Sequence, residues 1–175
     1  MSSRTSEAST APGPDAAWAP LPRVGNLESV YLHAGHLLVS RTPCRVTTVL
    51  GSCVSVGIWD PAAGIGGLNH FLLPHGAAQG ARVTRYGTAA MRALIDAVLA
   101  AGGRRNGLQA KLFGGACVLR SFQKSGWHLG TQNVAVARAV LLDEGIPLVA
   151  EDVEGERGRK LIFQTHDGSA WVRTL

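Results

Sequence analysis

The sequence predicts an α+β domain in which a layered β-sheet or sandwich packs against two main helices. Strand-like apolar patterns outnumber helical ones and mostly neighbour one another along the chain, an order typical of α+β domains. Two stretches space their apolar residues as a helix does. Glycine occurs 22 times in 175 residues, against about a dozen at average usage, which favours a turn-rich fold over a helical bundle.

The chain length suits one domain with a complete core. Residues 1–24 are rich in Ser, Ala, Pro and Gly, with prolines at positions 12, 14, 20 and 22. Such a composition predicts a disordered tail. A single domain is therefore expected over residues 25–175.

The first strands are expected over residues 30–39, interrupted at Ala34-Gly35, and over residues 45–50. Residues 54–59 read as a half-buried strand, because valine and isoleucine alternate there with serine and glycine. Residues 60–64, Asp-Pro-Ala-Ala-Gly, predict a tight turn, since proline fixes φ and glycine can adopt a left-handed conformation.

A helix is expected over residues 86–99, with Thr84 able to cap its start and Gly102-Gly103 at its end. Its apolar residues recur at helical spacing: Met91, Leu94, Ile95, Val98 and Leu99. A second helix is expected between Thr131 and Gly145. It places Val134, Ala137, Val140 and Leu141 on one face.

Further short strands are expected over residues 109–113, 147–151, 160–164 and 170–174. Residues 166–169 join the last two, and Asp-Gly between strand patterns is a strong hairpin signal.

Charge and cysteine usage narrow the class of protein. The net charge of +5 favours an acidic partner surface. Cys44, Cys53 and Cys117 cannot form a complete disulfide framework, and the sequence shows neither a long apolar run nor a signal-peptide pattern. These features predict a reduced, cytoplasmic protein with no membrane insertion. Cys44 and Cys117 are expected to be structural thiols.

The sequence lacks the motifs that are typical of several other functions. The glycines at positions 64, 66 and 67 do not have the spacing of a dinucleotide fingerprint, and no phosphate-binding loop follows. No paired Cys-x-x-Cys or His-x-x-x-His supports a zinc site. The basic residues are spread rather than clustered with aromatics, which argues against nucleic acid. We therefore expect no metal and no organic cofactor.

Cys53 and His70 are the best candidates for chemistry. The apolar run over residues 65–73 pairs with residues 54–59 if the intervening turn closes a hairpin. With Asp60 pairing near residue 63 or 64, Cys53 faces His70 or lies one residue off, and opposed Cβ atoms are roughly 4.5–5.5 Å apart. A thiol beside an imidazole is suited to acyl transfer, because the imidazole accepts the thiol proton and later delivers it to a leaving amine. Each residue alone is more commonly structural.

A third group is needed to orient the imidazole. Thr47 lies six residues before Cys53, an even offset that favours the same strand face if no bulge intervenes. Thr48 would then point away, unless Gly51 shifts the register. A backbone carbonyl is an alternative partner for the ring N–H. The backbone N–H of Cys53 and that of a neighbouring glycine are natural donors for an oxyanion hole.

These residues resemble the chemoreceptor glutamine deamidase CheD family of bacterial chemotaxis over about residues 27–174. The matching motifs, in chain order, are Thr47-x-x-Leu50-Gly51-Ser52-Cys53-Val54, Asp60-Pro61, Gly67-x-Asn69-His70-Phe71-x-Leu73-Pro74, Lys111-Leu112-Phe113-Gly114-Gly115-Ala116, Gly130-x-x-Asn133-Val134 and Gly158-Arg159-Lys160-x-x-Phe163. One departure is Glu154, which stands where the family tends to have glycine, and it draws attention to the conformation of that loop.

The resemblance implies an enzyme that converts glutamine side chains of chemoreceptor cytoplasmic helices to glutamate with release of ammonia. It implies Cys53 as nucleophile, His70 as general base and acid, and Thr47 as the residue that orients His70. It also implies a fold like that of the cytotoxic necrotizing factor toxins and, in some bacteria, a CheC-type phosphatase as partner.

Two other functions remain open at this point. A non-catalytic adaptor could bind receptors or a phosphatase through the same face, but it would not need Cys53, His70 and Thr47 together. A transglutaminase-like acyl transfer would need an amine-acceptor site, and the sequence identifies none.

Overall fold

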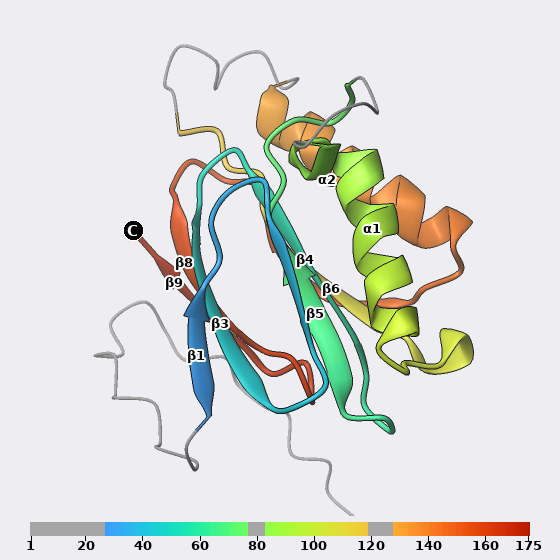
Figure 1. Ribbon diagram of the computed structural model, residues 1–175. Coiled ribbons are helices and arrows are strands. Elements are labelled where there is room, and N and C mark those ends of the chain that lie inside the picture. Colours follow the sequence, from blue (N-terminus) through green and yellow to red (C-terminus); the bar gives the residue numbers. More distant parts are fainter. Residues whose placement is uncertain (1–26, 77–82, 119–127) are drawn as a thin grey trace, which may run out of the picture.

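Two β-sheets lie face to face, and two helices cover the outer face of one of them (Figure 1). The computed structural model describes residues 27–76, 83–118 and 128–175. In these residues the mixed α+β architecture with two helices and two sheets is confirmed. The tail predicted for residues 1–24 lies outside the described residues.

The four-stranded sheet has the order β1-β3-β8-β9, and the five-stranded sheet has the order β2-β5-β4-β6-β7. The strands of the first are β1 (Glu28–Tyr31), β3 (Cys44–Leu50), β8 (Arg159–Gln164) and β9 (Ala170–Thr174). Those of the second are β2 (Leu37–Ser40), β4 (Val54–Asp60), β5 (Ile65–Asn69), β6 (Gln109–Gly114) and β7 (Leu148–Val153). Pairs β1/β3 and β6/β7 are parallel, and the other pairs are antiparallel.

The chain changes sheet three times over its first four strands, since β1 and β3 lie in one sheet and β2 and β4 in the other. The strand pattern expected over residues 30–39 is divided between β1 and β2, which belong to different sheets. Likewise β3 and β4 are consecutive in the sequence but lie in opposite sheets, joined by Gly51, Ser52 and Cys53. The thiol of Cys53 is therefore carried on a connection between the two layers.

The helices α1 (Gly87–Ala100) and α2 (Leu129–Asp143) begin close to the expected positions. The expected cap of α1 is wrong: Tyr86 is the N-cap residue, and the Thr84 hydroxyl donates to the Gly35 carbonyl instead. For α2 the start lies two residues before Thr131, because the His128 side chain accepts a hydrogen bond from the Thr131 N–H. Two short 3₁₀ turns, Val83–Arg85 and Arg105–Gly107, flank α1.

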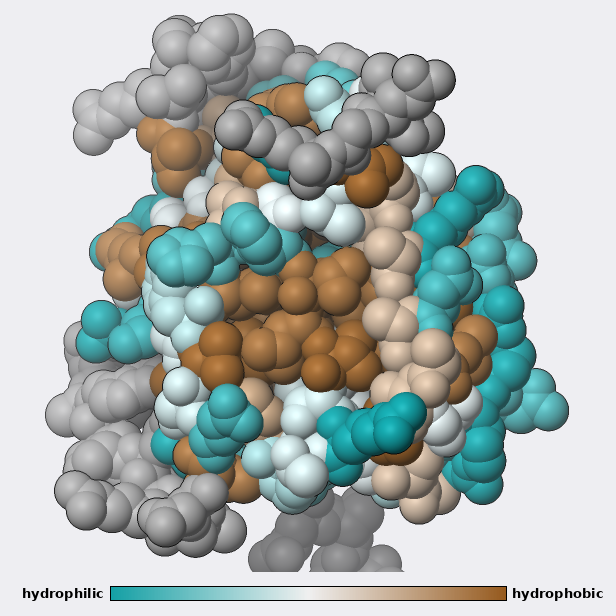
Figure 2. Space-filling model, viewed as in Figure 1, coloured by the Kyte–Doolittle hydropathy of each residue, from teal (hydrophilic) through white to brown (hydrophobic). Residues whose placement is uncertain are grey.

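Two apolar clusters hold the layers together. One lies between the sheets and includes Val46, Leu50, Leu68, Leu161 and Phe163, and the other lies between the five-stranded sheet and the helices and includes Val56, Ile58, Met91, Leu94 and Val134. The sheets approach closely at Gly57, where a Cβ atom would lie 2.5 Å from the Phe163 ring. Figure 2 shows apolar side chains reaching the surface in the region of the edge strand β2.

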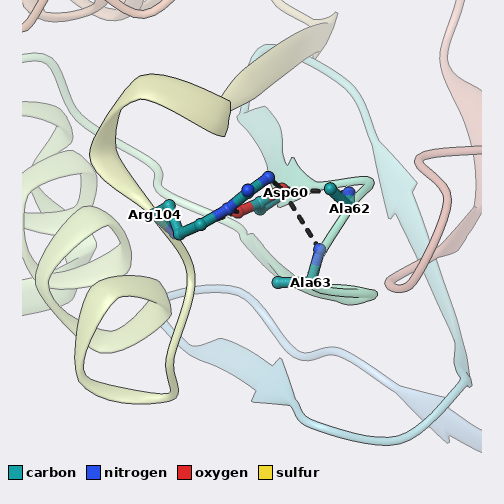
Figure 3. A network of polar contacts seen from close by, with 4 residues as sticks. All are labelled: Asp60, Ala62, Ala63 and Arg104. Carbon is teal, nitrogen blue, oxygen red and sulfur yellow. Dashed lines mark hydrogen bonds and ion pairs between the residues drawn. The ribbon is translucent and has the colours of Figure 1, made fainter.

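The β4–β5 hairpin has a longer turn than expected. Asp60 pairs with Ile65 rather than with residue 63 or 64, so the register expected for this hairpin is wrong. The turn is held from inside by the Asp60 carboxylate, which accepts hydrogen bonds from the backbone N–H groups of Ala62 and Ala63 and from Arg104 (Figure 3).

Candidate functional site

The β3–β4 connection lies at the upper end of the sandwich in Figure 1, close to the start of α2. Cys53 immediately precedes β4, and His70 immediately follows β5. Cys53 is half-buried against the cluster between the sheets, and His70 is 4% exposed. Both residues are therefore positioned by strands that are themselves anchored in the core.

The corrected register places the two side chains on one face as diagonal neighbours. Val54 bridges Phe71, and Gly57 pairs with Leu68. The same register sets His70 opposite Ser55 and Leu72 opposite Cys53. Diagonal residues on one face of an antiparallel pair are roughly 7–8 Å apart, and no hydrogen bond joins Cys53 to another described side chain.

The imidazole of His70 is held by a threonine of the opposite sheet. His70 Nδ1 lies 2.8 Å from Thr48 Oγ1, and that hydroxyl donates its hydrogen to the Leu32 carbonyl oxygen at 2.9 Å. A hydroxyl has one hydrogen, so Thr48 must accept from the Nδ1–H of His70. The Nε2 atom is then the unprotonated nitrogen, and it has no hydrogen-bond partner among the described residues although it is buried. The tautomer needed for a general base is thus set by Thr48.

The contact expected for Thr47 is wrong, and the reason lies in the fold. The inward-facing residues of β3 are the even-numbered ones, as the burial of Cys44, Val46 and Leu50 shows. Thr48 belongs to this set and is fully buried, whereas Thr47 points to the outer face. The even offset between residues 47 and 53 would place both side chains on one face only within a continuous strand. Here the chain crosses from one sheet to the other between β3 and β4, so the offset does not apply.

Burial shifts both titrating groups toward their neutral forms. It raises the pKa of the Cys53 thiol, an effect that the residue's own backbone N–H partly offsets. It lowers the pKa of His70 from 6.5 to about 4, with the nearby Leu32 carbonyl acting in the opposite direction. At neutral pH the pair is a thiol and a neutral imidazole, so proton transfer accompanies attack on a substrate rather than preceding it.

Asn133 is a member of the site that sequence reasoning left without a role. It lies on α2, is fully buried, and its Nδ2 donates to the carbonyl oxygens of Ser52 at 3.0 Å and Leu72 at 2.9 Å. Its Oδ1 has no partner among the described residues. The sequence carried two signals for it: a polar residue on the apolar face of the second helix, and its place in the Gly130-x-x-Asn133-Val134 motif.

The Gly114-Gly115 pair supports the cysteine from the neighbouring strand. Gly114 has φ 102°, and a Cβ atom there would lie 2.3 Å from the Cys53 carbonyl oxygen. That oxygen accepts a hydrogen bond from the Gly115 N–H at 2.8 Å. These two glycines therefore fix the backbone of Cys53.

Other candidate features lie away from this end or are structural. Cys44 and Cys117 are buried, and neither forms a disulfide bond within the described residues. In the part of the chain that the structure describes, no three His, Cys, Asp or Glu side chains are grouped so that they could hold a metal ion. No helix among these residues is long and apolar enough to cross a membrane.

Comparisons with known proteins point to one family. The family model described as "CheD chemotactic sensory transduction" matches residues 72–174. A probable chemoreceptor glutamine deamidase CheD 1 of Anaeromyxobacter dehalogenans is 48% identical over 88% of this chain and 89% of that protein. A probable chemoreceptor glutamine deamidase CheD of Rhizobium meliloti is 46% identical over 81% of this chain and 77% of its own length.

Solved structures are more distant. The Neisseria meningitidis protein NMB0706, of family DUF152, aligns with a TM-score of 0.48 and 14% identity over 81% of this chain and 76% of its own. The Bacillus licheniformis protein YfiH aligns with a TM-score of 0.42 and 15% identity over 69% of this chain and 49% of its own.

Proposed function

This chain belongs to the CheD family, and from that premise we propose that it is a protein-glutamine deamidase that acts on chemoreceptors. The observation that carries the proposal is the hydrogen-bonded chain from His70 through Thr48 to Leu32. It leaves Nε2 of a neutral imidazole without a partner among the described residues, and the half-buried thiol of Cys53 is the diagonal neighbour of this imidazole.

The residues have the following roles. Nε2 of His70 takes the proton of the Cys53 thiol as sulfur attacks the side-chain amide carbon of glutamine. The C–N bond breaks, and His70 returns the proton to the leaving ammonia. Water, with His70 again as base, then attacks the thioester, which releases glutamate and restores the thiol. Glutamine and water become glutamate and ammonium, and the sequence of steps requires no metal or organic cofactor.

The chemoreceptor as substrate is supported by the names of the relatives, which are probable chemoreceptor glutamine deamidases. Glutamine and glutamate side chains on a receptor helix form a polar, partly acidic surface, and the chain's net charge of +5 favours approach to such a surface. Because the cytoplasmic helices of receptors are the proposed substrate, we place the reaction in the cytoplasm.

Mass spectrometry of a receptor cytoplasmic fragment tests the proposal. Incubation with the wild-type protein is expected to raise the mass of selected peptides by about 1 Da, because OH replaces NH₂. Cys53→Ala and His70→Ala should abolish the change. Conversion that survives Cys53→Ala removes the nucleophile assignment, and receptor binding without any conversion by the wild type favours an adaptor.

Three finer expectations stay proposals. Two rest on the family resemblance: a CheC-type phosphatase as partner and a fold like that of cytotoxic necrotizing factor deamidases. The third, a single domain over residues 25–175, rests on chain length and composition. Co-elution of the chain with a CheC-type phosphatase from the same genome on size-exclusion chromatography would test the first, and two separately eluting proteins would contradict it.

A further inference from the structure

Asn133 joins the two chain segments that carry the proposed reacting groups. Its Nδ2 donates both hydrogens, one to the carbonyl before Cys53 and one to the carbonyl two residues after His70. This orientation of the amide is fixed, because the opposite one would set Oδ1 against two carbonyl oxygens. Both Nδ2 hydrogens are used in these bonds, so Asn133 cannot itself bind a substrate through them.

The direction of the Ser52 carbonyl determines the direction of the next N–H. Among the described residues every peptide bond is trans, and in a trans peptide the C=O and the following N–H point in opposite directions. The Ser52 carbonyl points to Asn133 on α2. The N–H of Cys53 therefore points away from the helix layer, toward the side between the sheets where its own side chain packs.

Within the part of the chain that the structure describes, that N–H takes no part in holding the fold together. No hydrogen bond connects it to another described residue, although the Cys53 carbonyl is bound by Gly115. This N–H also interacts with the sulfur of its own residue, where it partly offsets the effect of burial on the thiol pKa. A free backbone donor beside a nucleophilic sulfur lies where negative charge develops on the carbonyl oxygen of a tetrahedral intermediate.

We propose that Asn133 is a positioning residue that fixes the Ser52–Cys53 peptide so that the Cys53 N–H serves as an oxyanion donor. The inference rests on the proposed function, because it requires Cys53 to attack a carbonyl carbon. Asn133 acts through the peptide and contributes binding energy for the transition state only by holding that donor in place.

Two reactions of the same sulfur separate this role from a structural one. Acylation by p-nitrophenyl acetate passes through a tetrahedral oxyanion, with release of nitrophenolate as a burst. Alkylation by iodoacetamide is a displacement at carbon that forms no oxyanion, and its rate follows thiolate content and access. Both rates are measured on the full chain and assigned to Cys53 by their loss in Cys53→Ala.

Asn133→Ala is expected to slow acylation about 10- to 100-fold, near the lower range for loss of an oxyanion donor, because the N–H remains but is no longer held. Alkylation should change less than about threefold. Asn133→Asp sets a carboxyl oxygen against two carbonyl oxygens and should slow acylation at least as much. Val140→Ala is the matched control, since it removes buried apolar atoms two turns further along the same face of α2, and it should leave the ratio of the two rates unchanged.

Equal slowing of acylation and alkylation in Asn133→Ala, or the same rate ratio in Val140→Ala, would overturn the inference while leaving Cys53 as the nucleophile. A burst that persists in Cys53→Ala removes the proposed function and this inference together.

A measurement on the wild-type chain covers the case in which the variants do not fold. With ¹⁵N only in cysteine, the Cys53 amide proton should move downfield when an aldehyde analogue of glutamine forms a hemithioacetal with the sulfur, because the N–H then donates to the new oxygen. An amide resonance that does not move would contradict the role.

Discussion

The buried polar groups at the two ends of strand β4 differ in how completely they are hydrogen-bonded. At its C-terminal end the Asp60 carboxylate is fully buried and accepts hydrogen bonds from Ala62, Ala63 and Arg104. The Arg104 side chain holds the pKa of Asp60 far below its usual range. At the N-terminal end, His70 Nε2 and Asn133 Oδ1 have no partner among the described residues.

The difference shows which perturbed group marks a reactive site. Asp60 has a strongly shifted pKa, but all its acceptor capacity is used to close a turn, so it is a structural ion pair. His70 also has a shifted pKa, but one of its nitrogens is held and the other is free. If a shifted pKa were the only criterion, both ends of β4 would be identified as reactive sites. Incomplete hydrogen bonding distinguishes the reactive one.

The largest expected effect is on stability at the His70 end. The pKa of His70 is about 4 in the folded chain and about 6.5 when unfolded, so the unfolded chain binds more protons between these values. Stability is therefore complete above pH 6.5 and falls by about 3 kcal/mol as the pH drops to 4. His70→Gln should remove this loss, as measured by urea unfolding at pH 7 and pH 4.5. The exposed His33 is the control, and a loss that is equal in His33→Gln and His70→Gln would contradict the assignment.

The next effect separates two adjacent threonines. Thr48→Val keeps the shape of the side chain but removes the acceptor for His70 Nδ1–H. It should lower kcat for deamidation about 100-fold, or about 2.7 kcal/mol, because the imidazole is no longer held in one tautomer. Thr47→Val is the matched control and should change kcat little. If Thr47→Val proves the more harmful of the two, the inward-facing threonine has been misidentified.

A substitution at the Asp60 end of β4 should lower the stability of the protein but not its catalytic rate. Asp60→Ala leaves the hairpin turn without its buried acceptor and is expected to lower the free energy of unfolding by about 2 kcal/mol. Activity per folded molecule should stay unchanged. Because the folded pKa of Asp60 is lowered, its contribution is present at neutral pH and is lost as the pH falls below about 4.

The exposed Asp96 on α1 is the control for Asp60, and Asp96→Ala should unfold like the wild type. A fall in kcat for Asp60→Ala at a temperature where it is fully folded would contradict the separation of the two ends.

The smallest expected effect is on the loop after β7, which contacts Gly114 beside Cys53. Glu154 has φ 63° and is the only non-glycine with a positive φ among the described residues, while its N–H donates to the Gly114 carbonyl. Glu154→Gly should raise the free energy of unfolding by about 1 kcal/mol, because a left-handed conformation is unfavourable for a residue with a Cβ atom. Gly155→Ala, at φ 75°, should shift the thermal midpoint in the opposite direction. Equal midpoints for all three proteins would show that this backbone is not strained.

Much of the fold follows from local patterns. Alternation in residues 54–59 identified β4, and Asp-Gly near residue 167 identified the β8–β9 hairpin. Glu154 was the one departure from the family pattern noted in the sequence, and it is the residue with the unusual φ.

The site was predictable only in part. Cys53 and His70 share a face because an antiparallel pair keeps alternation in phase over the whole hairpin. Thr48 could not be chosen over Thr47, since the choice depends on the crossing from one sheet to the other, which is a tertiary property. Asn133 was hidden for a similar reason: its partners are backbone carbonyls, which carry no sequence signal.

The crossing between β3 and β4 also has a consequence for how activity is acquired during folding. The nucleophile and the base flank two strands of one sheet, and the threonine that sets the tautomer lies in a strand of the other. In a folding intermediate with one sheet formed, or with both formed but not yet docked, Thr48 would not contact His70. The imidazole would then have no fixed tautomer with which to accept the Cys53 proton. Such an intermediate would be inactive. The recovery of activity in a refolding experiment would therefore report the late docking of the two sheets.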